Sequence, residues 1–377
     1  MSDDNQKPPD SWCRDVMSGP TIEPIELREN DTVRDFFDRV FARSGFNGRR
    51  LAEAGRLYLR MIESGATICL TLAGAMTPIG MSGVIVELME KGFVDFIIST
   101  GANLYHDLHR PYGFPVVQGD AEMDDEELHA CGVARIYDTL IDEEETLIAT
   151  DQVVQEAVLQ MRPDRPISTA DLHHYLGARV LERAGSPRGS LLASAAELGV
   201  PVYTSSPGDS SVGMNVAMSV IYGRPLVIDP SLDVLETTAL VWRARENGAV
   251  EVGGGSPKNF YMQTQPMLWQ FLESNRGGHD YFIQLTTDSP HWGGLSGATP
   301  SEAKSWGKIQ PGREKNSVVV YSCASITFPL LAQYVLAAAK PRPLKRLFDG
   351  KDQALADLKE AALERPDIRR RLDTSGS

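Results

Sequence analysis

Short apolar runs recur along the chain, and each run ends in a loop of small residues. The runs are rich in Ile, Val and Leu, and a segment with helical spacing of apolar residues usually follows. Continuous apolar runs are typical of strands that are buried on both faces of a sheet. They predict strands at residues 66–71, 94–99, 200–204, 225–228, 249–252, 281–285 and 318–322. Strands that alternate with helices indicate an α/β protein with an open parallel sheet.

The same periodicity divides the chain into an arm, a domain and a tail. It predicts helices at residues 32–42, 49–64, 143–161 and 169–184. Residues 107–196 show no clear strand pattern, so we interpret them as a helical insertion. Residues 1–30 are predicted to be a flexible arm, and residues 341–377 a charged tail with a solvated helix. Residues 31–340 then form a single α/β domain with a doubly wound, mostly parallel, Rossmann-like sheet and a helical N-terminal arm.

Composition and charge narrow the class of protein. The chain has 377 residues, 42% hydrophobic and 23% charged, which is typical of a soluble globular protein. Its formal net charge of −14 argues against nucleic-acid binding, which depends on Lys and Arg, and suits a cationic small molecule. The polar N-terminus is unlike a secretory signal, and the four cysteines form no CxxC pair. We therefore expect a cytoplasmic protein without disulfides or a metal site.

One stretch raises the alternative of a membrane span. Residues 65–86 contain no charged residue, and their length is enough for a spanning helix. The stretch is rich in Thr, Gly and Pro, however, which favours a buried strand, a glycine-rich turn and a buried helix. We therefore expect no membrane partner.

Loops after the predicted strands carry the candidate chemistry, because ligands of open α/β sheets bind beyond the carboxyl ends of the strands. One such loop has three consecutive glycines ending at Gly255, followed by Ser256 as helix N-cap and Pro257 as first helical residue. It suits the pyrophosphate of a nucleotide, but a tight turn explains it equally well. Asp209 follows another strand and would hold ribose hydroxyls or cap the next helix.

A histidine pair follows the strand exit STGAN. His106 and His109 share one helix face, so they could bind a metal, but no third ligand lies nearby in the sequence. Ordinary polar helix residues are the interpretation that we favour. We predict no metal site.

The segment GGLSGATPSEAKSWGKI at residues 293–309 has two interpretations. In the first, Thr299 and Glu302 form a capping box, Gly307 ends the helix and Lys308 complements its negative end. That interpretation leaves Trp306 unexplained. In the second, a carboxylate, an indole and the Lys308 amine form a site for a cationic chain. The pattern alone leaves both open.

Four segments together resemble the deoxyhypusine synthase family: SEAKSWGKI, GGGSPKNF, CASITFPLL and STGAN. The resemblance extends over roughly residues 65–339. It implies a doubly wound sheet that binds NAD at the strand ends, in a homotetramer with sites between subunits. It also implies oxidation of spermidine, formation of a Schiff base on a lysine, and transfer of the aminobutyl group to a lysine of translation factor 5A.

The resemblance assigns roles to individual residues. Lys308 is the implied catalytic lysine, and an imine-forming amine must be neutral to attack. A carboxylate beside it would favour the charged form, so Glu302 is assigned to the substrate ammonium instead. The implied substrate residues are Gly293, Ser296, Glu302, Trp306, Asn259 and His106. The implied NAD residues are Thr100, Gly101, Ala102, Asp209, Gly254, Thr287, Asp288, Cys323 and Ala324.

Several positions depart from the family pattern. Tyr105 and His106 replace paired glutamates, Met214 and Leu295 replace aspartates, and Asn259 replaces a histidine. A buried pocket without these acids would hold the charges of spermidine poorly. Further acids or a histidine could compensate, namely Asp280, Asp288 or His291. At the cofactor positions, Asp288 stands where the family has an alanine, and one polar contact is changed, with Cys323 for an aspartate.

These departures keep alternatives open. One is a small-molecule polyamine synthase that passes the aminobutyl group to a free diamine, as homospermidine synthases do, or that uses agmatine. Another is a non-catalytic NAD-binding relative, although a retained Lys308 argues against it. The third is an ordinary NAD dehydrogenase, which would tolerate loss of Lys308.

Overall fold

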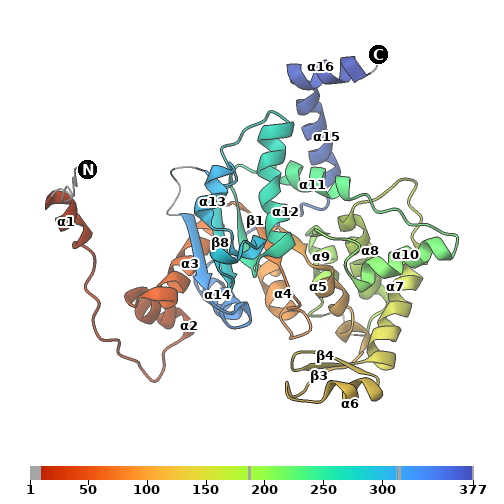
Figure 1. Cartoon of the computed structure of the whole chain (residues 1–377), viewed down its shortest axis with the longest axis horizontal. Helices are drawn as coiled ribbons and strands as arrows, with labels where there is room; N and C mark the ends of the chain where they lie inside the picture. The colour runs from red at the N-terminus through yellow and green to blue at the C-terminus, as the bar shows by residue number, and fades with distance from the viewer. Residues whose placement is uncertain (1–9, 186–187, 311, 313–315, 376–377) are drawn as a thin grey trace, which may run out of the picture.

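A computed structural model describes residues 10–185, 188–310, 312 and 316–375. Its centre is a six-stranded sheet in the order β6-β2-β1-β7-β8-β9, and every pairing is parallel (Figure 1). The strands are β1 (Thr67–Leu72), β2 (Phe96–Ser99), β6 (Val202–Thr204), β7 (Asn247–Val252), β8 (Tyr281–Thr286) and β9 (Ser317–Tyr321). The chain builds outward from β1 on one side and then from β7 on the other. This confirms the predicted doubly wound α/β fold.

Helices cover both faces of the sheet, because neighbouring residues of each strand point to opposite sides. Ile68 and Leu70 pack into one core and Cys69 into the other. The larger core contains α3 (Phe46–Glu63), α4 (Ser82–Glu90), α5 (Gly101–His106), α7 (Ala149–Gln160), α8 (Thr169–Arg183), α9 (Leu191–Leu198), α10 (Ser211–Ile221) and α14 (Ala324–Ala338). The smaller core contains α11 (Pro230–Arg243), α12 (Gly255–Pro266) and α15 (Lys351–Leu363).

Shorter helical segments complete the chain, and most connect larger elements. They are α1 (Asp10–Val16), α2 (Val33–Asp35), η1 (Phe36–Val40), η2 (Phe41–Arg43), η3 (Arg110–Tyr112), α6 (Asp125–Ala130), η4 (Glu143–Ile148), η5 (Met267–Phe271), η6 (Pro290–Trp292), η7 (Leu295–Gly297), α13 (Pro300–Ser305) and α16 (Pro366–Ser375). The predicted helices at 32–42, 49–64, 143–161 and 169–184 are all confirmed.

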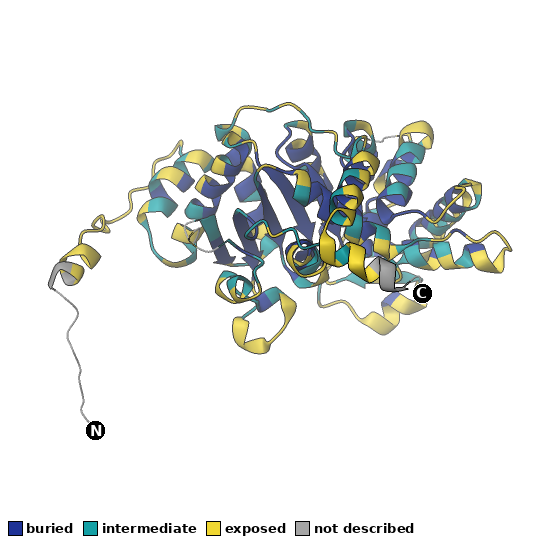
Figure 2. Ribbon diagram, turned by 90° about the horizontal axis from the view of Figure 1, so that it is seen from above, coloured by how far each residue is buried: buried dark blue, intermediate teal, exposed yellow. Residues whose placement is uncertain are grey.

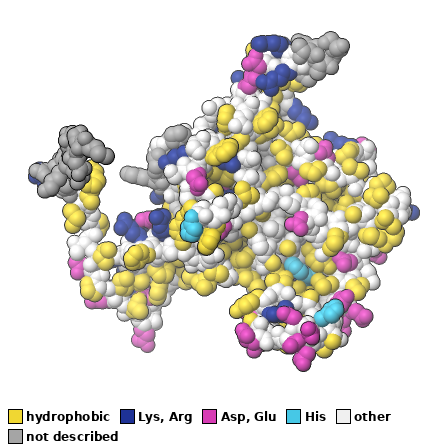
Figure 3. Space-filling view, in the orientation of Figure 1, with side chains coloured by type: hydrophobic (Ala, Val, Ile, Leu, Met, Phe, Trp, Pro, Cys, Tyr) yellow, Lys and Arg dark blue, Asp and Glu magenta, His cyan; other side chains and the backbone are white. Residues whose placement is uncertain are grey.

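Two sequence predictions about strands are wrong. Residues 225–228 form no strand, and only Ile228 makes an isolated bridge, to Ile167. The insertion at 107–196 is not purely helical, because it contains an antiparallel sheet in the order β3-β5-β4. These strands are β3 (Val116–Gln118), β4 (Val133–Ile136) and β5 (Thr139–Asp142). They are short and partly exposed, so they lack the continuous apolar run of a buried strand. Acidic side chains gather over this small sheet (Figure 3).

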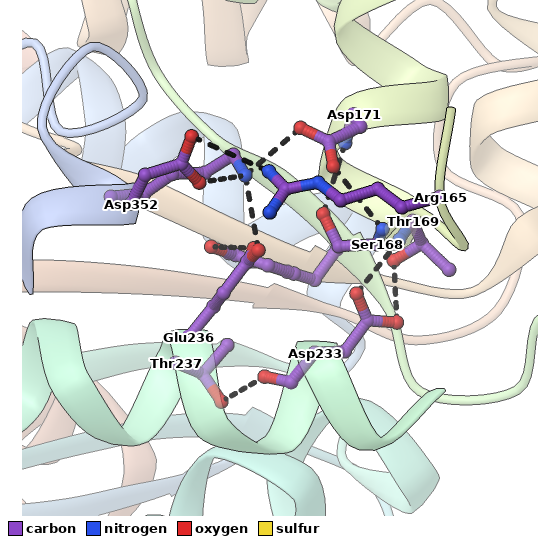
Figure 4. A network of polar contacts seen from close by, with 10 residues as sticks. Arg165, Ser168, Thr169, Asp171, Asp233, Glu236, Thr237 and Asp352 are labelled. Atoms are coloured by element: carbon purple, nitrogen blue, oxygen red, sulfur yellow. Dashed lines mark hydrogen bonds and ion pairs between the residues drawn. The ribbon is translucent and has the colours of Figure 1, made fainter. Parts of the chain in front are cut away.

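The charged tail is attached to the body instead of lying in solvent. Lys351, at the start of α15, is 4% exposed at its side chain and pairs with Asp171 at 2.9 Å and Glu236 at 3.0 Å. Figure 4 shows the carboxylates of Asp171, Glu236 and Asp352 turned toward one point. Arg342 pairs with the buried Asp95 at 2.6 Å. The prediction of a solvated tail is therefore corrected for Arg342 and α15, because buried carboxylates recruit these cations, whereas residues 363–371 are largely exposed.

The N-terminal arm contrasts with this tail. Residues 14–30 are exposed throughout and run along the outside to α1, away from the buried sheet (Figure 2). The uncharged stretch at 65–86 forms β1, a turn and the start of α4, as predicted. Within the described ranges, no helix combines the length and the apolar character needed to cross a membrane.

Candidate active site

The strand exits at the carboxyl edge of the sheet form the floor of the candidate site. The sheet order reverses between β1 and β7, which is where doubly wound folds open a ligand crevice. Gly253 and Gly255 have φ values of 79° and 58°, which favour glycine. A Cβ on Gly254 would lie 2.6 Å from the Cα of Ser296, so the backbones approach closely.

The helix after this loop begins earlier than the sequence predicted. Gly254 is the N-cap of α12 and has no side chain to cap it, so the assignment of Ser256 as N-cap and Pro257 as first helical residue is wrong. The Ser256 hydroxyl instead lies 3.5 Å from that of Ser206, on the loop after β6. The N-terminal amides of α12 are thus presented directly at the glycine loop.

The exits of β2 and β6 meet on the other side of the reversal. Thr100 is the N-cap of α5, followed by Gly101 and Ala102, and its hydroxyl donates to the Gly74 carbonyl at 2.7 Å. A Cβ on Gly101 would overlap Ser210, the residue after Asp209. Asp209 itself is exposed. The predicted cofactor positions of these two loops are therefore adjacent.

The exits of β8 and β9 carry the other four predicted cofactor positions. Thr287 and Asp288 follow β8, and Cys323 and Ala324 stand at the start of α14 after β9. A hydrogen bond with the Ser325 hydroxyl lowers the pKa of the exposed Cys323 thiol. All of these positions lie at the same edge of the sheet as the glycine loop.

Lys308 lies over this edge in the connection between β8 and β9. Its backbone N–H donates to Ala303 O, and its carbonyl accepts from the His279 N–H, both at 2.9 Å. Its Nζ donates to Asn259 Oδ1 on α12 at 3.0 Å and lies 5.8 Å from the centre of the Trp306 ring. Burial lowers the pKa of Lys308, and the neighbouring Lys258 ammonium lowers it further.

The short helix before Lys308 has the predicted capping box. Thr299 and Glu302 exchange side-chain and backbone hydrogen bonds, and Gly307 has a φ of 65° after the last helical residue. Glu302 Oε2 accepts from the Thr299 N–H at 2.7 Å. This contact and the Thr299 hydroxyl lower the pKa of Glu302. Trp306, in contrast, is 62% exposed beside the amine.

Ser296 and Gly293 belong to the loop that links these parts. The Ser296 hydroxyl accepts a hydrogen bond from the Gly255 N–H at 2.8 Å, which joins the η7 turn to the start of α12. Gly293 ends η6 with a φ of 73°. Leu295, beside Ser296, is 49% exposed at the surface.

Three buried polar residues near Lys308 were missed by the sequence analysis. Lys258 is 4% exposed, and its Nζ donates to Gln284 Oε1 at 2.9 Å and to Ala298 O at 2.7 Å. Gln284, on β8, and Glu251, on β7, are also buried. The only signal of Gln284 and Glu251 in the sequence was a polar residue inside an otherwise apolar strand run, whereas Lys258 lies on α12 after the glycine loop.

His106 lies apart from Lys308 in this chain. It contacts His109 at 2.8 Å, and His109 contacts the Thr150 hydroxyl at 2.7 Å on α7. Burial lowers the pKa of His106 to about 4, so the ring is neutral near neutral pH. Tyr105 beside it donates to the Leu147 carbonyl. The histidine pair has no third ligand of the usual kinds, since the described residues hold no cluster of three or more His, Cys, Asp or Glu that could bind a metal.

Comparisons with known proteins identify the family of the chain. A family model described as deoxyhypusine synthase matches residues 38–335. A deoxyhypusine synthase-like protein of Nostoc punctiforme is 44% identical over 351 residues, which are 91% of this chain and 89% of the relative. One of Thermosynechococcus vestitus is 42% identical over 367 residues, or 94% and 91%.

A solved structure shares the fold. It is that of a candidate deoxyhypusine synthase of Entamoeba histolytica, with a TM-score of 0.59 and 16% identity, covering 85% of this chain and 99% of that chain. The family model spans most of the residues that build the sheet and the Lys308 connection. The chain belongs to the deoxyhypusine synthase family.

Proposed function

We propose that this protein is an NAD-dependent aminoalkyl transferase in which Lys308 carries the transferred group as an imine. Family membership supports a transferase that acts on a polyamine. The observation that carries the proposal is the state of Lys308. Its amine has a lowered pKa, is held by the neutral Asn259 and lies beside the exposed indole of Trp306.

The strand exits fit a dinucleotide. Gly254 lets the Ser296 loop pack closely against the start of α12, and the N-terminus of α12 favours a pyrophosphate. Asp209 is an exposed carboxylate suited to ribose hydroxyls, next to Gly101. When bound, NAD would accept a hydride from the carbon beside the secondary amine of the polyamine and return it after transfer.

The chain's own residues would then act on the oxidised amine. Neutral Lys308 attacks the imine carbon, a bond from that carbon to Nζ forms, and the bond to the departing diamine breaks as the diamine takes up a proton. Trp306 would pack on the methylene chain, and Glu302 would pair with the terminal ammonium. The acceptor amine displaces Lys308 by the same chemistry.

Trapping with borohydride tests this proposal. The protein is incubated with NAD and spermidine, reduced with sodium borohydride, digested and analysed by mass spectrometry. We expect an aminobutyl adduct on Lys308 that is lost in Lys308→Arg, because a guanidinium stays protonated. Lys304→Arg is the matched control and should keep the adduct. No adduct on Lys308 with spermidine, putrescine or agmatine would refute the transferase mechanism.

A free diamine is a second candidate acceptor, in place of a lysine of translation factor 5A. The neutral state of His106 and the engaged hydroxyl of Tyr105 favour an altered amine pocket. Comparison of released amines with and without translation factor 5A separates the two acceptors. Formation of a homotetramer with sites between subunits is part of the proposal, and sedimentation measures the assembly.

A further inference from the structure

Glu251 is a carboxylate enclosed in the middle of the sheet. It lies on β7, where all six residues are buried, and it is 0% exposed. Its cross-strand neighbours are Thr71 on β1 and Gln284 on β8. Neither carboxylate oxygen has a hydrogen-bond partner, and the Thr71 hydroxyl also lacks one. Buried carboxylates are almost always paired, so this group requires an explanation.

The two lysines that could pair with Glu251 donate their hydrogen bonds to other residues. Lys258 directs its Nζ to neutral acceptors on Gln284 and Ala298, and Lys308 directs its Nζ to Asn259. Both ammonium groups nevertheless interact electrostatically with Glu251. The carboxylate therefore acts on the two lysines through its charge, at a distance, from a buried position beside the buried Lys258 and the half-buried Lys308.

We infer that Glu251 is a positioning residue that controls the charge state of Lys308 from the interior of the sheet. The inference rests on the proposed role of Lys308 as the attacking amine. Glu251 touches neither substrate nor cofactor, and its effect passes through the field that it creates at Lys308 and Lys258. Its enclosed position means that solvent ions screen this field less than they would screen a surface charge.

Ionisation of Glu251 opposes deprotonation of Lys308, because a negative charge favours the ammonium form of the lysine. Burial raises the pKa of Glu251 to about 8, although Lys258 and Lys308 act in the other direction. While Glu251 keeps its proton, it adds no negative charge, and the Lys258 ammonium lowers the pKa of Lys308. When Glu251 ionises, its negative charge favours the ammonium form of Lys308. A protonated Glu251 thus favours the neutral form of Lys308, and an ionised Glu251 opposes it.

Other titratable groups that face Glu251 do not change charge in this range. The Cys69 thiol on β1 and the Tyr261 hydroxyl on α12 are both buried, and burial raises the pKa of each. Both stay neutral between about pH 6 and pH 9. On the lysine side, Glu302 and Asp288 also act on Lys258 and favour its charged form. Burial lowers the pKa of His279, beside Lys308, to about 3, so its ring is neutral in this range.

Reductive alkylation of Lys308 measures its charge state directly. The full chain is treated with propanal and cyanoborohydride from pH 6 to pH 10, and alkylation is quantified for each lysine by peptide mass spectrometry. Glu251→Gln keeps the shape and removes the charge. We expect the pH of half-maximal Lys308 alkylation to fall by about 0.5 unit or more. The profile of Lys304 in the same spectra should not move.

Two further variants keep the test decisive. Glu251→Met removes the carboxylate without a new polar group and should shift the profile in the same direction, in case Glu251→Gln does not fold. Glu246→Gln, just before β7, is the matched control and should leave the profile in place. Unshifted Lys308 profiles in both folded Glu251 variants would overturn the inference.

The alkylation result is separable from the proposed function. Propanal reacts with any neutral amine, so the shift is measurable whether or not the protein transfers an aminobutyl group. A borohydride adduct without the shift removes only the role of Glu251. A shift without the adduct removes only the transferase mechanism.

Discussion

Asn259 positions the Lys308 amine, the candidate nucleophile, without adding a negative charge that would favour the ammonium form. A lysine amine ordinarily has a pKa of about 10.4, and each unit of lowering corresponds to about 1.4 kcal/mol between its protonation states. Burial and Lys258 supply the lowering at Lys308. The amide oxygen of Asn259 accepts one hydrogen bond and adds no negative charge. The side chain is thus positioned while its neutral form stays accessible.

Asn259→Asp should reverse this effect at nearly constant shape. A carboxylate 3.0 Å from Nζ would favour the ammonium form, so the Lys308 profile in reductive alkylation should move to higher pH. Transfer at pH 7 should fall about tenfold for each unit of that movement. Asn259→Gln, which stays neutral, is the control. An unchanged profile in Asn259→Asp would mean that Nζ does not contact this position in solution.

Part of this site could be predicted residue by residue. The capping role of Glu302 and the helix stop at Gly307 follow from local rules, and both are confirmed. The contact of Lys308 with Asn259 joins positions 49 residues apart and depends on tertiary packing. Glu251 was missed because a sequence shows a charged residue in an apolar run but not whether the fold gives it a partner. The roles in catalysis stay predictions.

At the scale of helices and strands, features set by the local sequence were predicted, and features set by tertiary packing were missed. The long buried strands and the amphipathic helix α3 were predicted because their periodicity is a local property. The start of α12 was misplaced because positive φ angles at Gly253 and Gly255, not a capping side chain, set it. The strands β3–β5 were missed because one small sheet needs little burial. The docking of α15 depends on carboxylates from α8 and α11.

Loss of Lys351 should loosen α15. Lys351→Ala leaves Asp171 and Glu236 without their buried cation, and breaking such a pair costs about 3–5 kcal/mol. We expect a lower urea midpoint and faster proteolysis near residue 350. Lys359→Ala, on the exposed side of the same helix, should change neither. Equal midpoints for the two variants would show that apolar contacts alone hold α15.

The whole molecule combines an acidic surface with an acidic interior. Burial raises the pKa of Asp233 to about 7 within the network below α15, and that of Glu251 to about 8. Both values lie above those of an unfolded chain, so the folded state binds protons more tightly. The stability contributed by these protons is complete below about pH 4 and is lost as pH rises through 7 and 8.

Thermal unfolding should therefore show a decline from pH 6 to pH 9. In Asp233→Asn the carboxyl cannot ionise, so the decline should become shallower, while the hydrogen bond from the Thr169 N–H can persist. Calorimetry at fixed ionic strength measures the difference. Asp367→Asn, an exposed acid on α16, serves as the control. Parallel curves for wild type and Asp233→Asn would rule out this source of pH dependence.

The exposed indole beside Lys308 has an optical consequence. Trp306 and Trp292 are 62% and 70% exposed, and Trp269 packs against Gly307 in the same connection. Trp306 therefore borders the Lys308 amine directly, and Trp269 lies next to the glycine that precedes Lys308. Their emission depends on solvent contact, so any molecule that binds beside Lys308 should change the intrinsic fluorescence of the protein. Tryptophan fluorescence can therefore report binding at this site, and the affinities of candidate amines can be ranked by titration without a label or an assay for turnover.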